Sequence, residues 1–225
     1  MQIVFLFYDG MTALDVVGPH EILCRLPGAV VKRVAKQAGT VNTDSAGLML
    51  TAEYALSDVS RADVLLIPGA GNATTLQKVP GLLDWVKAIH QTTSWTTSVC
   101  TGSLILGAAG LLKDLRATTH WAALDRLSTW GANPVSERIV EDGKVMTAAG
   151  VSAGIDMALT LAAKLSGLQI AQSLQLGIEY DPNPPFDVGS PQKASPAILE
   201  ALRSRLTTSF EHPQISNPIK NLPCD

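Results

Sequence analysis

Cys100 stands where a β-branched stretch, 95–99, meets an apolar stretch rich in Ala, Gly and Leu, 101–112. The first composition is typical of a buried strand and the second of a packed helix. The thiol is therefore expected at a strand-to-helix junction, where free N–H groups and the helix dipole stabilise an anion. This placement indicates a nucleophilic cysteine of lowered pKa. The alternative is an inert cysteine that only packs in the core.

An acid and a histidine are the side chains that could assist such a thiol. Asp15 follows the first expected strand between two apolar neighbours, and we expect its carboxyl close to the sulfur. The alternative is a capping box, because Thr12 stands three positions before it. His120 follows the expected nucleophile helix and is a candidate for a Cys–His pair with Cys100. Its alternative is a polar group at a helix start.

A competing nucleophile lies later in the chain. The segment Gly150-Val-Ser152-Ala-Gly154 matches the Gly-x-Ser-x-Gly elbow of serine hydrolases, between an expected strand and an expected helix. Such an enzyme needs a histidine further along the chain, and His212 in the C-terminal tail is the only candidate. Cys100 is therefore the preferred nucleophile. Neither a dinucleotide fingerprint nor a Walker loop is present, so the sequence gives no support for nucleotide binding.

Composition limits the class of protein. The 225 residues carry a formal net charge of −3, with 46% hydrophobic and 16% charged residues. Such a chain can bury a sizeable core, and a nucleic-acid or membrane partner is not expected. Cys24, Cys100 and Cys224 are widely spaced, which disfavours a disulfide framework or a metal site and favours the reducing cytoplasm. We expect no signal peptide and no membrane span.

Expected strands alternate with expected helices. Strands are predicted at 2–8, 29–35, 63–68, 95–99 and 144–148, helices at 19–26, 80–90, 101–112, 119–130, 152–166, 169–179 and 194–206, and a hairpin at 39–51. The first helix is placed from Pro19 because proline is tolerated in a first turn and breaks a helix interior. This order predicts a three-layer α/β sandwich with a mainly parallel sheet, as one domain at 1–206 with a tail at 207–225.

Several candidate residues follow the ends of expected strands. Asp15, the Gly69-Ala70-Gly71 loop, Cys100 and the Gly150-Val151 turn each come after such a strand. Parallel strands end at a common edge of the sheet, and ligands bind outside that edge. The sequence therefore predicts that these four pieces meet in one site around Cys100.

Four segments together resemble the DJ-1/PfpI superfamily and, within it, the isocyanide hydratases. They are Val99-Cys100-Thr101-Gly102, Pro68-Gly69-Ala70-Gly71, Leu14-Asp15-Val16-Val17-Gly18-Pro19 and Ala117-Thr118-Thr119-His120-Trp121. Similar segments occur in AraC-type regulators, but no DNA-binding module is expected after residue 206. PfpI-type proteases place histidine directly after the cysteine, where this chain has Thr101, and DJ-1 has glutamate where this chain has Asp15.

The resemblance implies a flavodoxin-like, class I glutamine amidotransferase-like fold and a homodimer with the site near the interface. It implies hydration of a small-molecule isocyanide to an N-substituted formamide, without cofactor or metal. Cys100 would form a thioimidate and Asp15 would move the protons, while Thr101 and the backbone N–H groups of Gly71 and Val151 would position substrate or charge. The alternatives are a glyoxalase-like hydratase acting on 2-oxoaldehydes and a non-enzymatic redox or ligand sensor.

Overall fold

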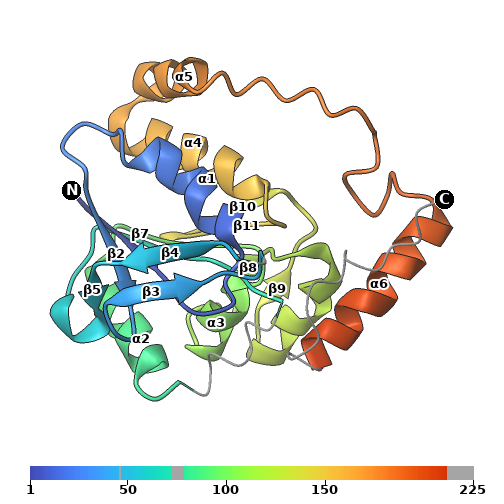
Figure 1. The fold of residues 1–225 in the computed structure, drawn as a ribbon, viewed down its shortest axis with the longest axis horizontal. Coiled ribbons are helices and arrows are strands. Elements are labelled where there is room, and N and C mark those ends of the chain that lie inside the picture. The colour runs from blue at the N-terminus through green and yellow to red at the C-terminus, as the bar shows by residue number, and fades with distance from the viewer. Residues whose placement is uncertain (46, 72–78, 212–225) are drawn as a thin grey trace.

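A seven-stranded sheet forms the centre of the computed structural model, which describes residues 1–45, 47–71 and 79–211 (Figure 1). The spatial order of its strands is β10-β11-β7-β6-β1-β2-β5. The strands are β1 (Gln2–Leu6), β2 (Val30–Ala35), β5 (Tyr54–Ala55), β6 (Val64–Ile67), β7 (Trp95–Val99), β10 (Ile139–Asp142) and β11 (Val145–Ala148). Neighbours run parallel except β10 and β11, which form an antiparallel hairpin. The predicted mainly parallel sheet is confirmed.

Helices cover both faces of this sheet, which gives the predicted three layers (Figure 1). One side carries α1 (Ala13–Leu23) and α4 (Ala153–Ser166), with α5 (Leu168–Gly177) packed on α4. The other side carries α2 (Leu82–Thr92), α3 (Gly102–Ala108) and the 3-10 helix η3 (Trp121–Trp130), and a short 3-10 turn, η1 (Leu56–Asp58), follows β5. Because both faces are covered, β6 is buried along its whole length, as expected for a strand of a parallel sheet.

Two small sheets lie outside the central one. β3 (Gly39–Asn42) and β4 (Met49–Ala52) pair antiparallel and form the hairpin that the sequence predicts. β8 (Arg116–Ala117) and β9 (Asn133–Pro134) pair parallel. The second pair was not predicted, because strands this short carry no usable alternation of polar and apolar residues.

The first helix differs from the prediction. α1 begins at Ala13, well before Pro19, which lies inside the helix. An interior proline loses one helical hydrogen bond and costs about 3 kcal/mol in isolation. Close packing against α4 offsets this cost. A Cβ at Gly18 would lie 2.9 Å from Ile155, and one at Gly154 would lie 3.1 Å from the Pro19 ring, so the two helices approach closely at these positions.

Four adjacent parallel strands deliver the candidate residues to one edge. β1, β6, β7 and β11 are neighbours in the sheet, and their carboxyl ends point the same way. The chain segments that leave these ends are 7–12, 68–71, 100–101 and 149–152. The predicted convergence at this edge is therefore confirmed.

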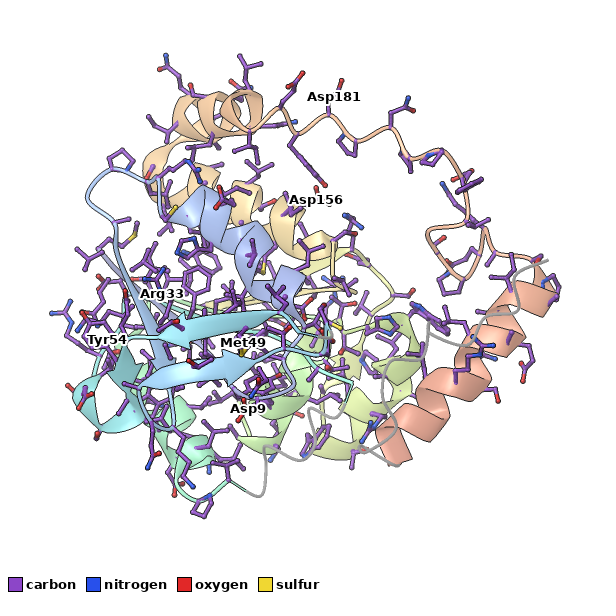
Figure 2. All side chains as sticks on the ribbon, viewed as in Figure 1. Asp9, Arg33, Met49, Tyr54, Asp156 and Asp181 are labelled. Carbon is purple, nitrogen blue, oxygen red and sulfur yellow. The ribbon has the colours of Figure 1, made fainter. Side chains whose placement is uncertain are left out.

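The C-terminal part of the chain leaves the body and returns. After α5 an extended segment that includes Asp181 leads round to α6 (Pro196–Glu211), which contacts η3 (Figures 1 and 2). The last helix was expected to end at residue 206, but it runs through Glu211. Residues 212–225, with His212 and Cys224, lie outside the described residues.

Candidate active site

Cys100 occupies a strained position at the predicted junction between β7 and α3. Its φ of 56° lies in the left-handed region, which is unusual for a residue with a side chain. Hydrogen bonds hold it there: Cys100 N–H donates to Ala149 O at 2.9 Å, and Thr119 Oγ1 donates to Cys100 O at 2.8 Å. Such strain costs about 1–3 kcal/mol and gathers at functional sites. The thiol is 6% exposed.

The ionisation of this thiol differs from the prediction. Burial raises the pKa of Cys100 well above its usual value, and the charge of Asp15 raises it further. The N–H groups of Val151 and Thr101 lower the same pKa by a smaller amount. The expectation of a low-pKa thiolate is therefore wrong for the protein without substrate. Desolvation outweighs the N-terminus of α3, which is a helix of only seven residues.

Asp15 is the partner of Cys100. Its side chain is 0% exposed, and its Oδ2 accepts a hydrogen bond from Gly69 N–H at 2.8 Å. Oδ1 is buried without a partner in good hydrogen-bond geometry among the described residues. Burial raises the pKa of Asp15 to about 7, with a further rise from the charge of Asp44. The Gly69 N–H and a hydrogen bond with the Cys100 side chain lower it. Burial is therefore the main cause of the raised pKa of Asp15.

The capping-box alternative for Asp15 is wrong. Thr12 is the N-cap residue of α1, and its side chain makes no capping hydrogen bond. Its hydroxyl donates instead to Asp44 Oδ2 at 2.6 Å. The Asp15 carboxylate turns toward Gly69 and Cys100 rather than back to the start of its own helix.

Thr101 fastens the 68–71 loop beside Cys100. Its hydroxyl accepts from Ala70 N–H at 2.8 Å and donates to Ala70 O at 2.7 Å. A Cβ at Gly69 would lie 2.6 Å from the Thr101 nitrogen and 2.9 Å from Asp15 Oδ2, so this position requires glycine. At Gly71, by contrast, no atom of the described residues lies within 4 Å of such a Cβ. The described part of the loop is thus tight beside the pair and unobstructed at Gly71.

The turn after β11 supplies the other side of the site. Val151 has a φ of 34°, and its N–H forms a hydrogen bond with Cys100. His120 lies beside this turn, since a Cβ at Gly150 would be 2.8 Å from its ring. Its Nδ1 accepts from Ala122 N–H at the start of η3, and burial lowers its pKa to about 4. His120 is therefore the polar residue at a helix start that the sequence analysis gave as the alternative to a Cys–His pair.

In the Gly-x-Ser-x-Gly segment, the Ser152 hydroxyl contacts a side chain that is not a general base. Ser152 Oγ accepts a hydrogen bond from Arg138, whose guanidinium also pairs with Asp156 on α4. A guanidinium stays charged and cannot act as a general base. The downstream histidine that the pattern needs, His212, lies outside the described residues. Within the described chain, Ser152 has no general base beside it.

Tyr8 also belongs to the site, although the sequence analysis missed it. Its hydroxyl donates to Pro68 O at 2.7 Å. Burial and the charges of Asp15 and Cys100 raise its pKa. The available signal was its position directly after β1, at the same edge of the sheet as the other candidates.

The described residues show neither a metal site nor a membrane span. No group of three or more His, Cys, Asp or Glu side chains among them could hold a metal ion. No helix in the described ranges is long and apolar enough to cross a bilayer.

Comparison with known proteins gives one consistent set of matches. The DJ-1/PfpI family model matches residues 1–164. The isonitrile hydratase of Pseudomonas putida is 44% identical over 211 residues, which cover 94% of this chain and 92% of that protein. The HTH-type transcriptional regulator CdhR of Pseudomonas aeruginosa is 33% identical over 129 residues, which cover 56% of this chain and 38% of the regulator.

Solved structures show the same similarity. A ThiJ/PfpI family protein from Pseudomonas syringae superposes with a TM-score of 0.89 at 38% identity, covering 93% of this chain and 87% of that one. Drosophila melanogaster DJ-1beta superposes with a TM-score of 0.71 at 17% identity over 79% of this chain and 97% of its own. The second match concerns the fold alone.

Proposed function

This chain belongs to the DJ-1/PfpI family, and from that premise we propose that it hydrates isocyanides to N-substituted formamides without a cofactor. The observation that carries the proposal is the buried pair of Cys100 and Asp15, in which the carboxyl has a pKa of about 7. Such a carboxyl can both accept and donate a proton near neutral pH. The similarity to an isonitrile hydratase along nearly the whole chain supports the same reaction, since isonitrile is another name for isocyanide.

The first step uses the pair as one unit. Above about pH 7 the two groups share a single proton, so the Asp15 carboxylate can take the proton of the Cys100 thiol. The sulfur then attacks the terminal carbon of R–N≡C. That carbon gains the C–S bond and negative charge, and Asp15 returns the proton to it. The product is a thioimidate, Cys100–S–CH=N–R, beside an ionised Asp15.

Water completes the reaction. The Asp15 carboxylate removes a proton from water as the oxygen adds to the thioimidate carbon, and this proton passes to the nitrogen. The tetrahedral adduct, S–CH(OH)–NH–R, collapses with cleavage of the C–S bond. Its hydroxyl proton returns to the sulfur, which restores the thiol and releases H–CO–NH–R. The sum is one isocyanide and one water consumed for each formamide.

Backbone N–H groups stabilise the charge that develops in this scheme. The Val151 N–H, which bonds to the sulfur in the free protein, would steady the thiolate as it forms and leaves. Thr101 would act through the loop that it fastens by its two hydrogen bonds with Ala70, and through the hydrogen bond of its side chain with Cys100. The Gly71 N–H, at the open end of that loop, would face the substrate. His120 has no part in the scheme.

We also propose that the protein works as a cytoplasmic homodimer. Leu14 and Val17 on α1, together with Leu48 and Met49 at the hairpin of β3 and β4, are exposed apolar residues. Exposed apolar residues mark protein–protein contacts where they gather into one patch, and a homodimer would bring these residues together. A partner on this side of the molecule would lie near the site, because α1 carries Asp15.

Formamide production from an aryl isocyanide by the purified protein tests the proposal. Cys100→Ala should abolish turnover while the fold is kept, and Cys24→Ala, which changes the half-buried cysteine at the end of α1, should retain it. Turnover by a folded Cys100→Ala protein would overturn the assignment. Methylglyoxal is the comparison substrate: its conversion without formamide production would indicate a glyoxalase-like hydratase, and inactivity toward both would indicate a sensor.

A further inference from the structure

Asp44 lies in the loop between β3 and β4, in the hairpin predicted at 39–51, but it was not among the candidate site residues. The loop is joined to the start of α1 by the backbone hydrogen bond from Asp44 N–H to Met11 O at 3.0 Å. Thr12, the next residue, donates its own N–H to Gly69 O at 2.8 Å. A continuous set of hydrogen bonds therefore runs from the hairpin loop, through the start of α1, to the loop that binds Asp15.

The Asp44 side chain supplies the cap that α1 otherwise lacks. Its Oδ2 accepts from the Thr12 hydroxyl at 2.6 Å, and the backbone N–H of Ala13 also stabilises its charge. Negative charge at a helix N-terminus is favourable because the N–H groups there are unpaired. α1 begins at Ala13, and Asp15 is the third residue of the same turn. The contacts that fix this turn therefore also fix the position of the Asp15 carboxyl.

We propose that Asp44 is a positioning residue for the proposed hydratase, which fixes the first turn of α1 against Cys100 and places a carboxylate beside the turn that carries Asp15. The inference rests on the proposed function for its catalytic meaning. The hydrogen bonds and the charge that carry it are independent of any substrate.

The electrostatic part follows from the groups that surround Asp15. Among the described residues, these titratable groups are Asp44 from the hairpin, Cys100 from the end of β7 and Tyr8 from the end of β1. Tyr8 and Cys100 are neutral at pH 7 because burial raises the pKa of each. Burial is the main cause of the raised pKa of Asp15, and the charge of Asp44, whose own pKa burial also raises, adds to it.

Alkylation of Cys100 measures this effect without a substrate. The rate of its reaction with iodoacetamide, followed on the Cys100 peptide by mass spectrometry, should rise as the pair loses its first proton, near pH 7. Asp44→Asn keeps an oxygen that can accept from Thr12 and removes the charge. We expect the midpoint of the plot of alkylation rate against pH to move down by about 0.3–1 pH unit in this variant, as for the loss of one nearby like charge.

Asp9→Asn is the matched control. Asp9 is exposed, and it accepts hydrogen bonds from the backbone and side chain of Asn42, at the end of β3 (Figure 2). It is not among the charges that act on Asp15. Its replacement should leave the midpoint unchanged. A midpoint that stays in place for a folded Asp44→Asn protein, or moves equally for Asp9→Asn, would overturn the inference.

Measuring formamide production distinguishes a failure of the Asp44 inference from a failure of the proposed hydratase function. In an active hydratase the ascending limb of kcat/KM against pH should shift down with the alkylation midpoint in Asp44→Asn. A shifted alkylation midpoint in a protein that makes no formamide would support the placement of Asp44 and refute the hydratase. Normal formamide production with both profiles unmoved by Asp44→Asn would refute the role of Asp44 alone.

Discussion

Replacing Asp15 with asparagine should make the protein more stable and much less active, with the gain in stability depending on pH. Burial raises the pKa of Asp15 from its usual 3.8 to about 7. Between these values the unfolded chain releases the proton and the folded chain keeps it, so the free energy of unfolding falls as pH rises. The loss is complete above about pH 7. A difference of roughly three units, at 1.36 kcal/mol each, amounts to about 4 kcal/mol.

Asparagine keeps the shape of the side chain and does not titrate. Its oxygen can still accept from Gly69 N–H, but the amide cannot pass a proton between sulfur, carbon and water. We expect the melting temperature of Asp15→Asn to exceed that of the parent by on the order of 10 °C near pH 8, and to match it near pH 4. Formamide production should fall by about 10²- to 10⁴-fold. Calorimetry at the two pH values and a formamide assay test both statements.

Asp84 provides the matched control. It occupies the third position of α2, as Asp15 does in α1, but its side chain is exposed. Asp84→Asn should change the free energy of unfolding by no more than about 0.5 kcal/mol at either pH. If Asp15→Asn instead loses about 1 kcal/mol at both pH values and keeps its turnover, Asp15 is a helix-capping residue and the pair has been misread.

Three further substitutions probe the surroundings of the pair. Gly69→Ala places a Cβ 2.6 Å from the Thr101 nitrogen, so we expect a loss of about 1–3 kcal/mol in unfolding free energy together with loss of formamide production. Gly71→Ala, where the Cβ meets no atom of residues 1–45, 47–71 or 79–211 within 4 Å, should leave stability nearly unchanged. Ser152→Ala should keep most of the activity, because Arg138 rather than a general base contacts the hydroxyl. Ester hydrolysis that disappears in a folded Ser152→Ala protein would restore the serine-hydrolase interpretation.

The sequence by itself predicted a mainly parallel sheet between helices and the place of the candidate nucleophile, Cys100, at a strand-to-helix junction. Runs of β-branched and apolar residues long enough to form buried strands alternate with helical segments, and this order permits few topologies. A parallel sheet then brings Cys100, Asp15 and Val151 to one edge, although they are far apart in the chain. Residue types and their positions after strands are local properties, so they can be read from the amino acids alone.

Tertiary structure alone decided where α1 begins and how the pair ionises. The interior Pro19 is tolerated because α4 packs closely against it at Gly154. The pKa of Cys100 rises because neighbours from several elements exclude water from the thiol, and the N-terminus of α3 is too weak to compensate. Asp44 acts on the pair through space from a separate hairpin. Packing, desolvation and long-range charge effects depend on which segments come into contact in the folded protein. The order of residues along the chain does not by itself specify those contacts.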